Sequence, residues 1–178
     1  MQKTDLIDKY LPQYTFSEYH ATMVKCPIEN VYQIAKDVDL SKSKLITLLF
    51  KIRGLPTKRL NLQSFIADIG FTNLEENYPY ENLIGFWTKG KVEKVPSHKA
   101  FVSNSISPWL KAVWNFKFEA MDKGKTRVST ETRGLCVAPI TRFTFGLYWS
   151  TIKPFSGMTR VKMLRIIKDE SEALTKSI

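Results

Sequence analysis

The middle of the chain alternates between hydrophobic and polar residues, and this period of two predicts β-strands. The clearest stretch is 111–121, which places small and aromatic residues on one face and polar residues on the other. The hydrophobic face consists of Ala112, Trp114, Phe116, Phe118 and Ala120. Weaker forms of the pattern predict strands over 16–26, 71–77, 82–88, 100–106 and 126–136, with turns at 78–81 and 122–125.

Other stretches repeat their hydrophobic residues every three or four positions, as amphipathic helices do. Leucine and isoleucine follow this spacing over 42–53, and Gly54 and Pro56 come next, in the order that ends a helix. The same spacing predicts helices over 28–35 and 62–69, and a long helix that follows Pro139 and continues to the C-terminus. Pro154 and Gly157 are expected to kink or break this last helix.

This order of elements predicts an α+β fold in a single domain that spans 1–178. A single antiparallel sheet needs a cover for its hydrophobic face, and the terminal helix is the only long element left to provide it. We therefore expect a helix-grip fold: a curved antiparallel sheet wrapped around a long kinked C-terminal helix, with two short helices after the first strand.

The net charge of +10 is concentrated in two segments. Segments 41–60 and 138–168 each contain six lysines and arginines and no acidic residue, so the rest of the chain carries a net charge of −2. Such segments form a basic patch if the fold brings them together, or two solvated helix faces if it does not. The pattern alone leaves both interpretations open.

Several classes of protein are excluded or disfavoured. The first ten residues contain no hydrophobic signal sequence, and no stretch approaches the roughly 20 hydrophobic residues of a membrane span, so we expect a cytoplasmic protein. Cys26 and Cys136 are interpreted as two buried thiols rather than a disulfide. His20 and His98 have no partner at ligand spacing, so structural or surface roles are favoured, and neither a metal nor a cofactor is expected.

Six short stretches resemble the START-like, or SRPBCC, superfamily, which includes polyketide cyclases and birch-pollen-allergen-like proteins. In order, the stretches are Phe16–His20, Arg53–Pro56, Ala112–Phe116, Ser129–Arg133, Tyr148–Trp149 and Lys153–Gly157. The chain is similar in particular to an uncharacterised bacterial branch of this superfamily. It lacks the glycine-rich loop of the plant members, so the ligands of those members are not carried over.

The resemblance implies a cavity between the sheet and the C-terminal helix. We expect it to bind a hydrophobic small molecule of lipid, polyketide or aromatic type, with a role as a carrier or sensor. The predicted ligand-binding residues are Trp114, Asn115, Phe116, Phe118, Glu131, Arg133, Tyr148 and Trp149. The alternative is an enzyme of the cyclase or aromatase type, in which Glu131, Arg133, Asn115 and Tyr148 assist proton transfer. Nucleic-acid binding is not expected, because the aromatic residues fall on core stripes.

The positions of three features depend on the fold. Glu131 and Arg133 share one face of strand 126–136; they are either a structural ion pair or the anchor of a ligand's polar end, depending on which face lines the cavity. In a helix grip the first and last strands pair, which would place Cys26 near Thr126 and Cys136 near Phe16, too far apart for a disulfide. The two basic segments would then lie near the cavity entrance and attract an anionic head group or an anionic membrane surface.

Overall fold

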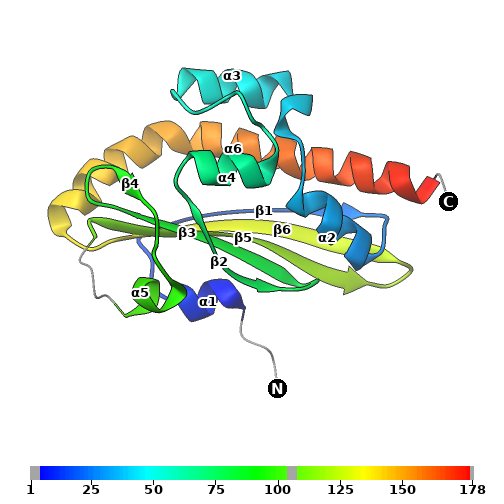
Figure 1. Cartoon of the computed structure of the whole chain (residues 1–178), viewed down its shortest axis with the longest axis horizontal. Coiled ribbons are helices and arrows are strands. Elements are labelled where there is room, and N and C mark those ends of the chain that lie inside the picture. The colour runs from blue at the N-terminus through cyan, green and yellow to red at the C-terminus, as the bar shows by residue number, and fades with distance from the viewer. Residues whose placement is uncertain (1–4, 104–107, 177–178) are drawn as a thin grey trace.

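The computed structural model describes residues 5–103 and 108–176, and it consists of a six-stranded antiparallel sheet with one long helix packed across it (Figure 1). The strand order is β1-β6-β5-β3-β2, and β4 pairs with β3. The strands are β1 (Phe16–Val24), β2 (Thr72–Asn77), β3 (Glu81–Thr88), β4 (Val92–Glu93), β5 (Leu110–Met121) and β6 (Lys125–Cys136). The helices are α1 (Leu6–Tyr10), α2 (Ile28–Lys36), the short 3₁₀ helix η1 (Leu40–Lys42), α3 (Lys44–Ile52), α4 (Leu62–Asp68), α5 (His98–Val102) and α6 (Pro139–Lys176).

The predicted pairing of the first and last strands is confirmed. β1 and β6 run antiparallel, with Phe16 opposite Gly134 and Val24 opposite Thr126. The hydroxyl of Thr126 donates a hydrogen bond of 2.8 Å to the carbonyl oxygen of Cys26. Cys26 therefore lies at one end of this strand pair and Cys136 at the other, and both are free thiols. The prediction that both are buried is wrong for Cys136, which is partly exposed because it lies at the end of β6.

The main hydrophobic core lies between the sheet and helices α2, α3, α4 and α6. The even-numbered residues of β5, Trp114, Phe116 and Phe118, contribute to it together with Met163 and Ile167 of α6. Because side chains alternate along a strand, Val128, Thr130 and Thr132 of β6 also face α6, while the odd-numbered residues of both strands face away from it. The structure thus decides which face of β6 points toward the helix.

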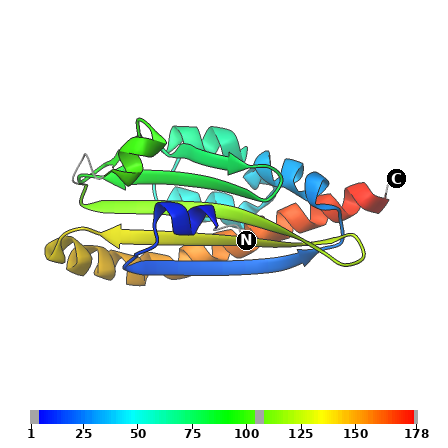
Figure 2. The same cartoon turned by 90° about the horizontal axis from the view of Figure 1, so that it is seen from below.

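The opposite face of the sheet is covered as well, which the sequence did not predict. Figure 2 shows α1 lying across this face, with α6 on the far side of the sheet. A second core forms here, in which Leu6, Ile7 and Tyr10 of α1 pack with Leu83 and Val113 of the sheet. Burial on both faces explains why β3 and the first half of β5 expose so little surface.

Two predicted elements are wrong in part. Residues 98–102 form helix α5 instead of the predicted strand, and Ser97 caps this helix by accepting a hydrogen bond from the backbone of Ala100; the rest of the predicted strand, 104–106, lies outside the described residues. Helix α6 continues through Pro154 and Gly157, although Figure 1 shows that it bends along its length. Pro154 leaves the carbonyl of Ser150 without its helical partner, but both residues are exposed, so water can bind that carbonyl.

Among the helices of residues 5–103 and 108–176, none combines the length and hydrophobicity of a membrane-spanning segment. Within the same residues, no group of three or more His, Cys, Asp and Glu side chains is placed to hold a metal ion.

Candidate functional site

Arg160 of α6 directs its guanidinium toward the sheet, although the residue as a whole is only partly buried. Its guanidinium lies over the indole ring of Trp114, with 3.7 Å between the guanidinium carbon and the ring centroid. Its Nη2 donates a hydrogen bond of 3.0 Å to the hydroxyl of Thr132. Nη1 is buried and has no hydrogen-bond partner among the described residues. Stacking on an aromatic ring and a bond to the sheet fix the plane of this cation, yet one of its nitrogens remains unsatisfied.

A carboxylate and an imidazole from β1 lie beside Arg160. Glu18 and His20 share the strand face that points toward α6, and Glu18 Oε1 lies 3.0 Å from His20 Nε2. The side chain of Glu18 is only 6% exposed, and its Oε2 is buried without a partner among the described residues. Gly157 of α6 makes room for this pair, because a Cβ atom there would lie 2.8 Å from Glu18 Oε1.

Glu18 and Arg160 are close enough for the carboxylate to stabilise the cation electrostatically, but they form no ion pair within 4.0 Å among the described residues. Burial nevertheless dominates and lowers the pKa of Arg160 to about 9. Buried polar atoms in native structures are nearly always satisfied by protein, water or a ligand. One unsatisfied donor and one unsatisfied acceptor in the same cluster are therefore suited to a small polar group that both accepts and donates.

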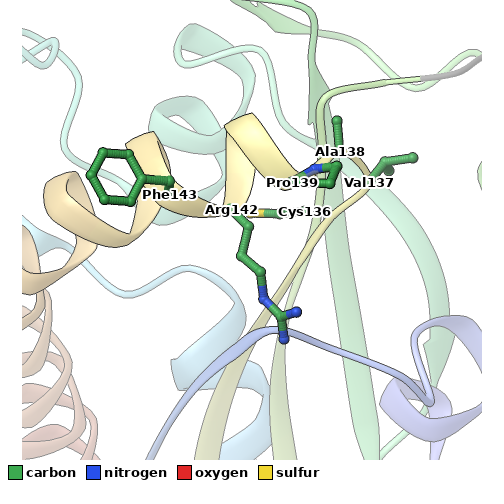
Figure 3. A pocket seen from close by; sticks show the side chains of 6 residues that line it. All are labelled: Cys136, Val137, Ala138, Pro139, Arg142 and Phe143. Carbon is green, nitrogen blue, oxygen red and sulfur yellow. The ribbon is translucent and has the colours of Figure 1, made fainter.

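A pocket with a volume of about 410 Å³ lies where β6 passes into α6. It is lined by Cys136, Val137, Ala138, Pro139, Arg142 and Phe143. Figure 3 shows the side chains of Arg142 and Phe143 leaving the first turns of the helix in different directions. Burial raises the pKa of the Cys136 thiol, an effect that Arg142 partly opposes.

The pocket and the Arg160 cluster lie along the same face of β6. Thr132 in the cluster and Cys136 in the pocket are four residues apart, about 13 Å at strand spacing, and Gly134 between them has no side chain. Phe16 pairs with Gly134 across the strands, and its ring contacts Phe145 of α6 at 5.3 Å between centroids. A partly exposed aromatic cluster therefore lies between the two features.

Of the predicted ligand-binding residues, the three aromatic residues of β5 lie in the main core. Trp114 contacts Arg160 and donates a hydrogen bond of 2.7 Å to the hydroxyl of Thr130. Phe116 and Phe118 border a void of about 10 Å³, which has room for about one water molecule. In this structure these two rings therefore pack as core residues.

Three predicted polar residues, Asn115, Glu131 and Arg133, lie on the face away from α6. Arg133 donates hydrogen bonds of 2.6 Å to Glu131 and to Asp8 of α1. Asn115 donates to the buried carboxylate of Glu81, which in turn accepts the backbone N–H groups of Leu6 and Ile7 at 2.7 and 3.3 Å. These polar residues hold α1 on the sheet, and α1 in turn leaves the Glu131–Arg133 pair largely buried.

The last two predicted residues lie on the first half of α6. The hydroxyl of Tyr148 accepts a hydrogen bond of 3.3 Å from Arg53 at the end of α3. The ring of Trp149 stacks against Phe145 at 6.0 Å and lies 6.2 Å from Phe16. Trp149 therefore borders the path between the pocket and Arg160, whereas the hydroxyl of Tyr148 is directed toward α3.

Sequence reasoning did not select Glu18, His20, Thr132 or Arg160 as site residues. A usable signal was present: Glu18 and His20 are two residues apart on a predicted strand and so share a face. Arg160 precedes Met163 and Leu164 by three and four positions, which puts a cation on the hydrophobic stripe of the terminal helix. A charge on the buried side of a helix is a candidate functional group.

No protein-family model matches the chain, and no curated protein sequence is significantly similar to it. Several solved structures are similar over most of their length. A protein from Mesorhizobium loti has a TM-score of 0.45 and 12% identity, and the match covers 88% of this chain and 98% of that one. A hypothetical protein from Helicobacter pylori has a TM-score of 0.44 and 10% identity, with 96% and 97% covered. An aromatase/cyclase from a Streptomyces species has a TM-score of 0.36 and 12% identity, with 88% and 93% covered.

Proposed function

We propose that the protein binds a hydrophobic small molecule with an anionic group, of lipid, polyketide or aromatic type, between the sheet and α6, as a carrier or sensor. The observation that carries this proposal is Arg160: a buried cation, fixed by Trp114 and Thr132, with an unsatisfied Nη1. A ligand carboxylate would accept from Nη1, and a hydroxyl group of the ligand would donate to Glu18 Oε2.

The hydrophobic part of the ligand would extend from Arg160 toward the pocket at the start of α6. The pocket volume of about 410 Å³ lies within the range of roughly 300–1,000 Å³ that small-molecule sites occupy. The rings of Phe16, Phe145 and Trp149 lie on the way, and their partial exposure allows them to rearrange around an aliphatic or aromatic body. Gly134 itself contributes no side chain to this path, and the side chain of Leu110 lies 3.5 Å from where a Cβ at Gly134 would be.

The test compares a fluorescent fatty acid, cis-parinaric acid, with its uncharged methyl ester. We expect the acid to bind the wild-type protein and the ester to bind about tenfold more weakly or less, since a charge-assisted hydrogen bond is lost. Arg160→Gln should weaken binding of the acid to the level of the ester. Arg165→Gln is the matched control, because Arg165 lies on the same helix but is 71% exposed.

Equal binding of acid and ester to the wild type would overturn the assignment of Arg160 as the anion anchor. If neither the acid nor the ester binds the wild type, the proposed class of hydrophobic ligand is wrong. Native mass spectrometry of protein purified from its own host gives the complementary test, since a co-purified molecule should be lost in Arg160→Gln and retained in Arg165→Gln.

The pairing of Glu18 with His20 favours a second candidate, an enzyme of the cyclase or aromatase type. His20 would remove a proton from a carbon between two carbonyl groups, and Arg160 would hold the resulting enolate oxygen. The enolate carbon would then attack a third carbonyl, further along the same molecule, forming a carbon–carbon bond, and the proton held by His20 would pass to the new alkoxide. Glu18 would orient His20.

The first half of this reaction can be measured by itself. A linear aryl β-diketone in heavy water should exchange its central protons faster with the protein than in buffer, and His20→Gln should abolish the acceleration. His98→Gln is the control, because His98 lies at the start of α5 on the other side of the sheet. Exchange no faster than in buffer, or unchanged in His20→Gln, excludes the enzyme hypothesis and leaves the binding proposal intact.

A further inference from the structure

The first half of α6 exposes large hydrophobic side chains on its outer face. Ile140, Phe143 and Leu147 are spaced at i, i+3 and i+7, and they are 70%, 67% and 61% exposed. The inner face of the same segment is also hydrophobic, since Phe145 and Trp149 pack against Phe16. A helix that is hydrophobic on both faces is normally buried, so the outer face lacks the cover that its composition calls for.

Helix α3 extends this hydrophobic surface. It packs on α6 (Figure 1). Arg53 at its C-terminal end donates a hydrogen bond to the hydroxyl of Tyr148. Its outward residues Leu48 and Ile52 are 53% and 64% exposed. Together, Leu48, Ile52, Ile140, Phe143 and Leu147 are called the outer apolar surface below.

The charge around the outer apolar surface has one sign. The segments that carry it, 41–60 and 138–168, contain twelve lysines and arginines and no acidic residue. Four of these cations, Lys42, Arg59, Arg165 and Lys168, pair with carboxylates from outside the two segments. Among the exposed cations, Lys51 and Arg142 are adjacent in sequence to Ile52 and Phe143, Lys44 lies four positions before Leu48, and Lys153 lies six positions after Leu147. Hydrophobic side chains surrounded by cations are the composition of surfaces that insert into the interface of an anionic bilayer.

We propose that the outer apolar surface docks onto a membrane that contains anionic lipids, with Phe143 and Leu147 inserted at the headgroup boundary and Lys51 and Lys153 against the lipid phosphates. A bilayer fits these observations better than a second copy of the chain, because face-to-face copies would bring two acid-free basic surfaces together. The same surface borders the pocket, since Phe143 contributes to both. Docking by this surface is independent of whether the proposed ligand binds.

The experiment is flotation of the full chain with vesicles of phosphatidylcholine alone, or of phosphatidylcholine mixed with phosphatidylglycerol. We expect binding to the mixed vesicles only, and a marked loss when salt is raised to about 1 M, where the Debye length falls to about 3 Å. Phe143→Gln with Leu147→Gln should lower binding about tenfold or more, because two inserted side chains are removed. Lys51→Gln with Lys153→Gln should lower it several-fold.

Matched controls lie elsewhere on the surface. Leu174→Gln removes an exposed leucine from the far end of α6, and Lys25→Gln with Lys123→Gln removes two exposed cations outside the basic segments. Neither should change vesicle binding. The proposal is overturned by absence of binding to mixed vesicles, by equal binding to both vesicle types, or by losses as large in the controls. It is also overturned if Phe143→Gln with Leu147→Gln converts a dimer in solution to a monomer without changing vesicle binding, since the surface would then be a dimer interface.

Discussion

Two largely buried arginines, Arg133 and Arg160, lie on opposite faces of the sheet in different surroundings. Arg133 is bound by two carboxylates, Glu131 and Asp8, and also donates to the backbone carbonyl of Leu11. Arg160 has a hydroxyl and an aromatic ring but no carboxylate within ion-pair distance among the described residues. Removing a cation from a satisfied buried pair is costly, whereas a buried cation without a direct partner already carries a desolvation penalty.

This contrast predicts opposite responses to the same substitution. Arg133→Met should lower the free energy of unfolding by about 2–3 kcal/mol, because it leaves Glu131 without its partner under α1. Arg160→Met should change it by less than about 1 kcal/mol or increase it, as expected at a site kept for binding. Urea unfolding of both variants measures the difference. Equal losses would indicate that Arg160 is a structural residue and would weaken the proposed function.

At the level of elements, two glycines of α6 face β1, and the space for an added methyl group differs between them. A Cβ at Gly157 would lie 2.8 Å from Glu18 Oε1, whereas a Cβ at Gly146 would lie 3.7 Å from the ring of Phe16, an ordinary contact. Gly146→Ala should therefore stabilise the protein by up to about 1 kcal/mol through helix propensity alone. Gly157→Ala should lose that gain, because the new methyl group displaces Glu18 from His20. The melting temperatures of the Gly146→Ala and Gly157→Ala variants measure this difference. Equal stabilisation would show that Glu18 can move away from His20 with no loss of stability.

Helix α1 is held by two carboxylates whose pKa values shift in opposite directions. Hydrogen bonds from Lys9 and Tyr10 lower the pKa of Glu75 below its ordinary 4.5, so its contribution to stability is present above pH 4.5 and is lost as pH falls through the lowered pKa. Burial raises the pKa of Glu81, so its contribution is present below pH 4.5 and is lost as pH rises through the raised pKa. Unfolding free energies of Glu75→Gln and Glu81→Gln, measured from acid to neutral pH, should therefore depart from the wild type with opposite slopes. Parallel curves would contradict these pKa shifts.

Local pattern predicted the long strands and failed for the two short helices, α1 and α5, which cover the second face of the sheet. Strands β5 and β6 alternate strongly and were predicted within one residue of their observed bounds. Helix α1 has only five residues and is stabilised by contacts with Glu81 and Glu75, more than 60 positions away, which no local pattern reveals. Helix α5 was predicted as a strand because Phe101 and Val102 favour strands, and its cap at Ser97 outweighed that preference.

At the scale of the whole molecule, the two faces of the sheet carry different features. One face of the sheet and α1 form a second hydrophobic core, which the Arg133–Asp8 ion pair borders, and this leaves the other face and α6 to hold the Arg160 cluster. The basic segments lie on α6 and on the stretch that contains α3, so the sequence correctly indicated that the charge belongs to helices. It could not place the Glu131–Arg133 pair, because the face of β6 is decided by the register with β5 and by α1.

If the pocket and Arg160 are two ends of one site, a ligand anchored at Arg160 must shield the pocket thiol. Cys26 is fully buried and serves as the internal reference, whereas Cys136 lines the pocket and should react with a maleimide. Labelling is compared at one fixed pH, because only the thiolate reacts and burial raises the pKa of Cys136. A fatty acid at ten times its dissociation constant should slow labelling of Cys136 by about tenfold.

The same labelling experiment tests whether Arg160, which does not line the pocket, controls protection of Cys136 inside the pocket. Protection of Cys136 should disappear in Arg160→Gln at the same fatty-acid concentration and persist in Arg165→Gln, although neither substitution alters a residue that lines the pocket. Binding of the fatty acid without protection of Cys136 would separate the pocket from the site and confine the ligand to the Arg160 cluster. Protection that survives Arg160→Gln would mean that the ligand occupies the pocket without its anionic group reaching the guanidinium.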